Sequence, residues 1–113
     1  MKKDRVRDYA TAAFRDYALY GLAPQEKPLT NTQTADIYAV HKTLEYFEST
    51  SRSYVVSAVK AVYFAGADKP IRTRNISERV SQFAVNCPAD ESTVYRWLKE
   101  ARSKFADFRG LTH

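Results

Sequence analysis

The sequence contains few of the residues that hold small proteins together by covalent or metal cross-links. Its 113 residues include one cysteine, Cys87, and two histidines, His41 and His113. A lone cysteine cannot form an internal disulfide, and no second cysteine is present to complete a zinc site. The two histidines lie far apart in the chain. We therefore expect neither a bound metal nor a cofactor.

Long apolar runs are also missing, as are the motifs of common enzymes. The longest apolar run, Ala61–Ala67, is far shorter than the roughly 18 residues of a membrane span, and nothing resembles a secretory signal. The chain has no Gly-rich phosphate loop, no paired His/acid metal motif and no catalytic triad. The sequence thus predicts a cytoplasmic protein that does not bind membranes and is not an enzyme.

Positive charge is what the chain has in excess. The formal net charge is +5 and the isoelectric point is about 9.4. More than half of this excess lies in residues 92–113, where five Lys and Arg residues face only Glu100 and Asp107. A weaker basic cluster lies in residues 2–8. This balance suits a partner that carries phosphates.

Apolar side chains recur at intervals of three and four residues along most of the chain, which is the spacing of amphipathic helices. No segment alternates apolar and polar residues convincingly over the length of a strand. The length allows one core but not two ordinary domains. We therefore expect residues 1–113 to form a single all-α domain of about five helices, at 4–20, 34–48, 52–65, 75–85 and 91–109, with a loop at 22–32.

The last two expected helices and the turn between them follow the order of a helix-turn-helix, which we assign to residues 72–109. Asn75 or Ser77 would cap the fourth helix at its N-terminus, and the turn at residues 86–89 would end it. Asp90 would then cap the fifth helix. One face of this fifth helix is apolar and must be buried; it consists of Val94, Leu98, Ala101 and Phe105.

The opposite face of the fifth helix, which Gly110 terminates, carries hydroxyls, cations and one aromatic ring but no carboxylate. Arginine can donate two hydrogen bonds to a guanine edge, and lysine, serine and tyrosine can bind phosphates or bases. A recognition helix enters the major groove by its N-terminal part. We expect Arg102 to bind backbone phosphates, and Arg72 and Arg74 to grip the flanking backbone. The predicted DNA-binding residues are Arg72, Arg74, Ser92, Thr93, Tyr95, Arg96, Lys99, Arg102 and Ser103.

The string Glu91-Ser92-Thr93-Val94-Tyr95-Arg96-Trp97-Leu98-Lys99-Glu100-Ala101-Arg102-Ser103-Lys104-Phe105 resembles the recognition helix of the promoter-reading domain of bacterial sigma factors. It is also similar to small sigma-like regulators of phages and prophages. The resemblance covers residues 75–108. It implies sequence-specific binding of double-stranded DNA, regulation of phage or prophage transcription, and contact with RNA polymerase. The chain departs from the family at residues 86–89, where the usual glycine is missing from the turn.

The first expected helix is separated from the other four by the loop at residues 22–32. Gly21 and Pro24 end it. We expect the many aromatic side chains of the N-terminal half to pack in the core. The alternative is that residues 1–21 project from the rest of the domain and provide the surface of a homodimer. DNA-binding modules of this size often dimerise to read two half-sites.

Two other functions are compatible with the sequence. The first keeps DNA binding but makes the protein a packaging or architectural component of a phage. The second is a helical protein-interaction module that does not bind DNA, because a helix with cations on its outer face is often merely solvated. The salt dependence of DNA binding separates the second function from the others.

Overall fold

The computed structural model describes residues 5–21, 28–65, 73–87 and 89–111, and all regular secondary structure within these ranges is helical. The prediction of an all-α fold with about five helices is confirmed. The elements in chain order are α1 (Arg5–Asp16), η1 (Tyr17–Gly21), α2 (Asn31–Ser49), α3 (Ser53–Val59), η2 (Lys60–Phe64), α4 (Thr73–Asn86) and α5 (Glu91–Arg109), where η1 and η2 are single π-helical turns.

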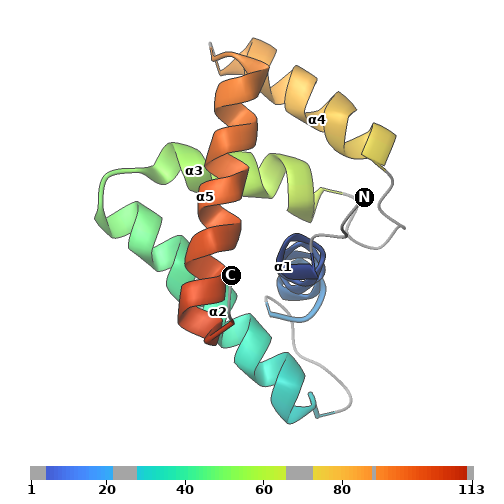
Figure 1. Cartoon of the computed structure of the whole chain (residues 1–113), viewed down its shortest axis with the longest axis vertical. Helices are drawn as coiled ribbons and strands as arrows, with labels where there is room; N and C mark the ends of the chain where they lie inside the picture. Colours follow the sequence, from blue (N-terminus) through green and yellow to red (C-terminus); the bar gives the residue numbers. More distant parts are fainter. Residues whose placement is uncertain (1–4, 22–27, 66–72, 88, 112–113) are drawn as a thin grey trace.

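Helix α5 is the element around which the others pack. It contacts α1, α2, α3 and α4. In Figure 1, α5 runs along the long axis of the molecule, α4 meets it at one end, and α1 and α2 lie toward its other end. None of the helices in the described residues has the length and apolar content needed to cross a bilayer.

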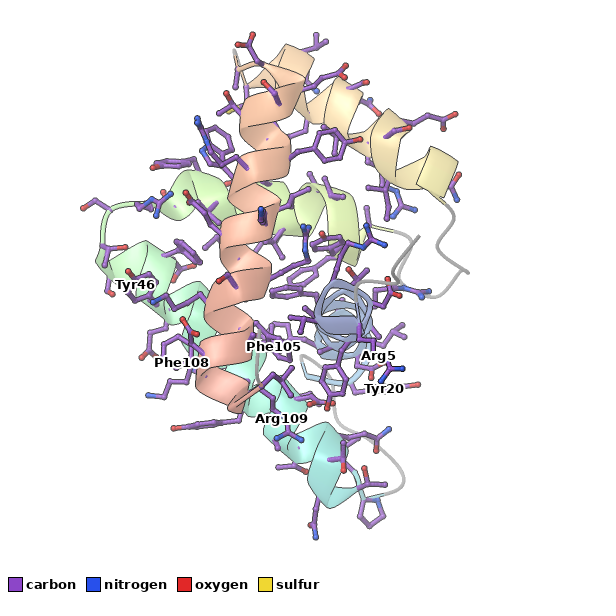
Figure 2. The ribbon with its side chains drawn as sticks, viewed as in Figure 1. Arg5, Tyr20, Tyr46, Phe105, Phe108 and Arg109 are labelled. Atoms are coloured by element: carbon purple, nitrogen blue, oxygen red, sulfur yellow. The ribbon has the colours of Figure 1, made fainter. Side chains whose placement is uncertain are left out.

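Three aromatic rings from different elements meet at the centre of the core. Phe14 of α1 stacks on Tyr63 of η2, with ring centroids 5.5 Å apart, and packs at 5.7 Å against Phe105 of α5. Figure 2 shows Phe105 directed from α5 toward α1. All three side chains are almost completely buried. Burial of such large rings is a major source of stability in a domain of this size.

Helix α1 packs against the rest of the domain, as expected for its aromatic residues, and does not project from it as the alternative for residues 1–21 required. Ala10, Ala13 and Phe14 are buried against the other helices. The Tyr9 hydroxyl also donates a hydrogen bond of 2.7 Å to Asp36 Oδ1 on α2. The small alanines allow close approach of the neighbouring backbones, so this face is a packing surface. Residues 1–4 lie outside the described part of the chain.

Helix α2 begins at Asn31, three residues earlier than expected, because Thr30 and Gln33 form a capping box. The Gln33 amide donates to Thr30 Oγ1 over 3.1 Å, and the Thr30 amide donates to Gln33 Oε1 over 2.9 Å. The loop expected at residues 22–32 therefore ends two residues earlier than expected, at Thr30. Its central part, residues 22–27, lies outside the described residues.

Two expected helices end in π-helical turns, a feature that the sequence did not predict. These turns are η1, at the end of the first expected helix, and η2, at the end of the third. In η2 the Ala65 amide donates to the carbonyl of Lys60, five residues back, over 3.2 Å. A π-turn shifts the following side chains around the helix axis. Val62 and Tyr63, which are adjacent in sequence, are both buried. The carbonyl of Val62 accepts a 2.9 Å hydrogen bond from Arg79 Nη1 of α4.

Helix α4 begins at Thr73, so neither Asn75 nor Ser77 is its N-cap, as had been expected. Both residues lie within the first turns of the helix. The helix ends at Asn86, and the Cys87 amide donates to the Phe83 carbonyl over 2.9 Å. Pro88, in the turn before α5, lies outside the described residues.

Candidate nucleic-acid interface

The bounds of α5 agree with the local signals in its sequence. Asp90 occupies the N-cap position with extended backbone angles (φ −74°, ψ 150°), although its side chain makes no capping hydrogen bond. Gly110 ends the helix in the left-handed conformation, at φ 80°, which glycine adopts without steric cost. Between them the helix runs for 19 residues. The prediction for this element is confirmed at both ends.

Three of the predicted DNA-binding residues form an exposed row on α5. Ser92, Arg96 and Lys99 are all exposed, and their spacing of four and three residues puts them on one side of the helix. Ser103 continues the row and is half-buried. The opposite side is fully packed, as predicted, with Val94, Leu98, Ala101 and Phe105 buried.

Tyr95 and Arg102 lie on the flank of α5 that faces α1 and α4, where they line a cavity together with residues of both helices. Tyr95 remains 42% exposed. Arg102 is half-buried, and its Nη1 donates a hydrogen bond of 2.7 Å to the Tyr63 hydroxyl. The guanidinium expected to bind phosphates therefore also binds a residue of the protein's own core.

The remaining predicted residues do not join the exposed row. Thr93 is half-buried. Nearby, the Trp97 ring packs against that of Tyr54, with ring centroids 4.7 Å apart. Arg72 lies outside the described residues. Arg74 belongs to the first turn of α4, but its side chain is not among those that the structure describes.

Each carboxylate of α5 has a partner within the protein. Glu91 Oε1 accepts a 2.6 Å hydrogen bond from Ser81 Oγ of α4, and Glu100 forms an ion pair with Arg52. Asp107 Oδ2 lies 3.9 Å from Lys104 Nζ. By contrast, neither cation of the exposed row forms an ion pair or hydrogen bond within the described residues; these cations are Arg96 and Lys99.

The pair of Arg52 and Glu100 is a feature of this surface that the sequence did not predict. The two residues are 48 positions apart in the sequence. The sequence of α5 alone puts Glu100 beside the exposed row but does not show which residue pairs with it. The contact is possible because Arg52 stands at the N-cap of α3, which packs against α5. The positive charge of Arg52 offsets the negative charge of Glu100, which is adjacent to Lys99 in the sequence.

Helix α4 is held against α5 and η2 by polar contacts as well as by its apolar face. The bond between Ser81 and Glu91 spans the turn between the two helices, and Arg79 fixes α4 to the carbonyl of Val62.

Within the described residues, His, Cys, Asp and Glu side chains form no group of three or more that could hold a metal ion. Comparison with protein-family models, curated proteins and solved structures finds no match to this chain.

Proposed function

We propose that this protein binds double-stranded DNA in a sequence-specific manner, with the N-terminal half of α5 in the major groove, and regulates transcription. One observation carries the proposal. Arg96 and Lys99 point to solvent without a partner in the described residues, while every carboxylate of the same helix is bound to the protein. A phosphate or guanine can thus approach these cations without displacing an existing ion pair.

The dimensions and polarity of the helix fit this role. An α-helix enters the major groove of B-DNA, where base pairs differ in their hydrogen-bonding patterns. Arg96, one turn into α5, is positioned to read a base, whereas Lys99 and Ser92 suit phosphates or bases. The positive end of the helix dipole also lies at this N-terminal half and attracts phosphate.

The role of Arg102 differs from that of Arg96. Its hydrogen bond to Tyr63 fixes the guanidinium at the flank of the helix. In the proposed complex Arg102 contributes positive charge beside the groove, and Arg96 makes the base contact. Regulation of phage or prophage genes is supported by the resemblance of residues 91–105 to sigma-factor recognition helices.

The test is a set of fluorescence-anisotropy titrations with duplexes selected from a random pool, at several salt concentrations. Arg96→Ala is expected to weaken binding of the selected site by about 1–3 kcal/mol and to relax the preference at one position. Lys99→Ala is expected to weaken all duplexes alike and to reduce the log–log salt slope by about 0.9.

Lys60→Ala is the matched control, because Lys60 is an exposed lysine on η2 whose surroundings include Glu45 and Glu48. It should bind like the wild type. If the wild-type protein binds no duplex even at low salt, the protein is not a DNA-binding protein. If it binds and both α5 variants behave like Lys60→Ala, the interface lies on another surface.

A further inference from the structure

A cavity of about 500 Å³ lies next to the proposed interface, between α1, η2, α4 and α5. This volume is within the range of sites that bind small organic molecules. The cavity is lined by side chains from all four elements, so it depends on the tertiary fold and not on one helix. Tyr63 and Leu98 belong to its lining and are buried.

Positive charge dominates the lining. Three guanidinium groups contribute to it, from Arg7 and Arg15 on α1 and from Arg102 on α5. Among the described residues of the lining, the one carboxylate is Asp8, whose Oδ1 lies 3.6 Å from Arg7 Nε. The described lining residues thus carry a formal net charge of about +2, which favours an anion in the cavity.

Arg102 is oriented for such a ligand. Tyr63 accepts a hydrogen bond from its Nη1, and a guanidinium carries five N–H donors in a fixed plane. Donors thus remain for a carboxylate or phosphate. Since the Tyr63 side chain is 2% exposed, its hydroxyl holds the guanidinium in place before any ligand arrives. Such preorganisation lowers the entropic cost of binding.

Apart from Thr11 and the tyrosine hydroxyls, the rest of the described lining is apolar, and this decides what kind of anion fits. Ala12, Ile76 and Leu98 line the cavity together with the ring of Tyr95. An inorganic phosphate, or a single phosphate of a DNA backbone, would engage the cations but leave this apolar part and most of the volume unfilled. We propose that the cavity binds an organic anion in which a carboxylate or phosphate ester is attached to an apolar ring system.

The proposal does not depend on DNA binding, and it is tested on the full chain without DNA. Naphthyl phosphate and naphthoate are titrated by isothermal calorimetry, beside inorganic phosphate and naphthol. At least one of the two organic anions is expected to bind at a single site at least tenfold more tightly than either control. The comparison of these two anions distinguishes a phosphate ester from a carboxylate as the preferred ligand.

Two variants locate the site. Arg15→Gln should weaken the organic anion at least tenfold, whereas Lys60→Gln, which removes an exposed cation outside the cavity, should not change it. Ala12→Trp retains every charge but fills the apolar part of the cavity, and it should abolish binding while the helical circular dichroism is unchanged. If Arg15→Gln fails to fold, Ala12→Trp decides alone. Equal binding of organic anions and controls, or wild-type binding by Ala12→Trp, overturns the proposal.

Discussion

Arg52 forms an ion pair with Glu100, which joins the connection between α2 and α3 to the middle of α5. The same guanidinium donates from Nε to the Tyr54 hydroxyl over 2.9 Å and lies 5.3 Å from the centre of the Phe47 ring. Glu100 is the carboxylate adjacent in sequence to Lys99 of the exposed row. The pair therefore determines how much negative charge the proposed DNA surface presents.

Glu100→Gln should increase DNA affinity because it removes that negative charge next to the phosphates. We expect an increase of about two- to fivefold at low salt, the size of an exposed charge interaction, and a smaller increase as salt is added. Fluorescence anisotropy with a fixed duplex measures it. Glu48→Gln, an equal change at an exposed position of α2, should have no effect. An unchanged affinity for Glu100→Gln at low salt would contradict the proposed surface.

Asp36→Asn should destabilise the fold. Asp36 is 7% exposed, and its Oδ1 accepts hydrogen bonds from Tyr9 Oη and Arg109 Nε, each 2.7 Å long. Hydrogen bonds to charged groups contribute about 1.5–3 kcal/mol, and we expect a loss in this range in urea unfolding. Asp90→Asn is the matched control, since Asp90 is exposed and its side chain makes no capping bond. It should change the free energy of unfolding by less than about 0.5 kcal/mol.

Asp16→Asn should stabilise the protein at neutral pH. Burial, and then repulsion from Asp36, raise the pKa of Asp16 above its ordinary value of 3.8. The folded state therefore binds the proton more tightly than the unfolded state. The resulting stability is present below pH 3.8 and is lost as pH rises through the elevated pKa, so the charged carboxylate destabilises the fold at neutral pH.

Urea unfolding at a series of pH values measures this effect. At neutral pH the variant should be more stable than the wild type by up to about 1 kcal/mol. The difference should disappear as pH falls below 3.8, where the wild-type carboxyl is protonated in both states. A difference that is independent of pH would show that the charge of Asp16 is not its cause.

Phe105→Ala should cost about 3–5 kcal/mol, because the ring is completely buried and its removal leaves a cavity among aromatic neighbours. The milder Phe105→Leu should cost less than about 1.5 kcal/mol. Phe108, one turn later on the same helix, is 45% exposed. Phe108→Ala should therefore cost less than about 1 kcal/mol in the same thermal or urea unfolding experiments. Equal losses for both alanine variants would mean that the core is not centred on Phe105.

The predictions from sequence succeeded where local signals agreed with one another. The ends and buried face of α5 follow from the apolar spacing, the position of Asp90 and the glycine at 110, all within one segment. The start of α2 was missed although Thr30 and Gln33 carry the capping-box pattern. No comparable local pattern marks the π-turn at residues 60–64.

The environment of Arg102 could not be predicted from the helical wheel. A wheel distinguishes the buried face from the exposed face, but it does not say which elements pack along the flanks. The bond to Tyr63 joins residues 39 positions apart and depends on the placement of η2 beside α5. The burial of α1 has the same origin, since its alanines are buried in a fold where α1 contacts elements distant in the sequence, among them α2 and α5.

The position of α5 at the centre of the fold also has a consequence for protein synthesis. All four helices that α5 contacts precede it in the chain, so they leave the ribosome while the groove for Val94, Leu98 and Phe105 is still empty. Domains fold as units, and incomplete ones expose apolar surface that favours aggregation. The helix proposed to bind DNA is thus also the helix that closes the core. A nascent chain that lacks it has neither a complete core nor the proposed DNA-binding surface.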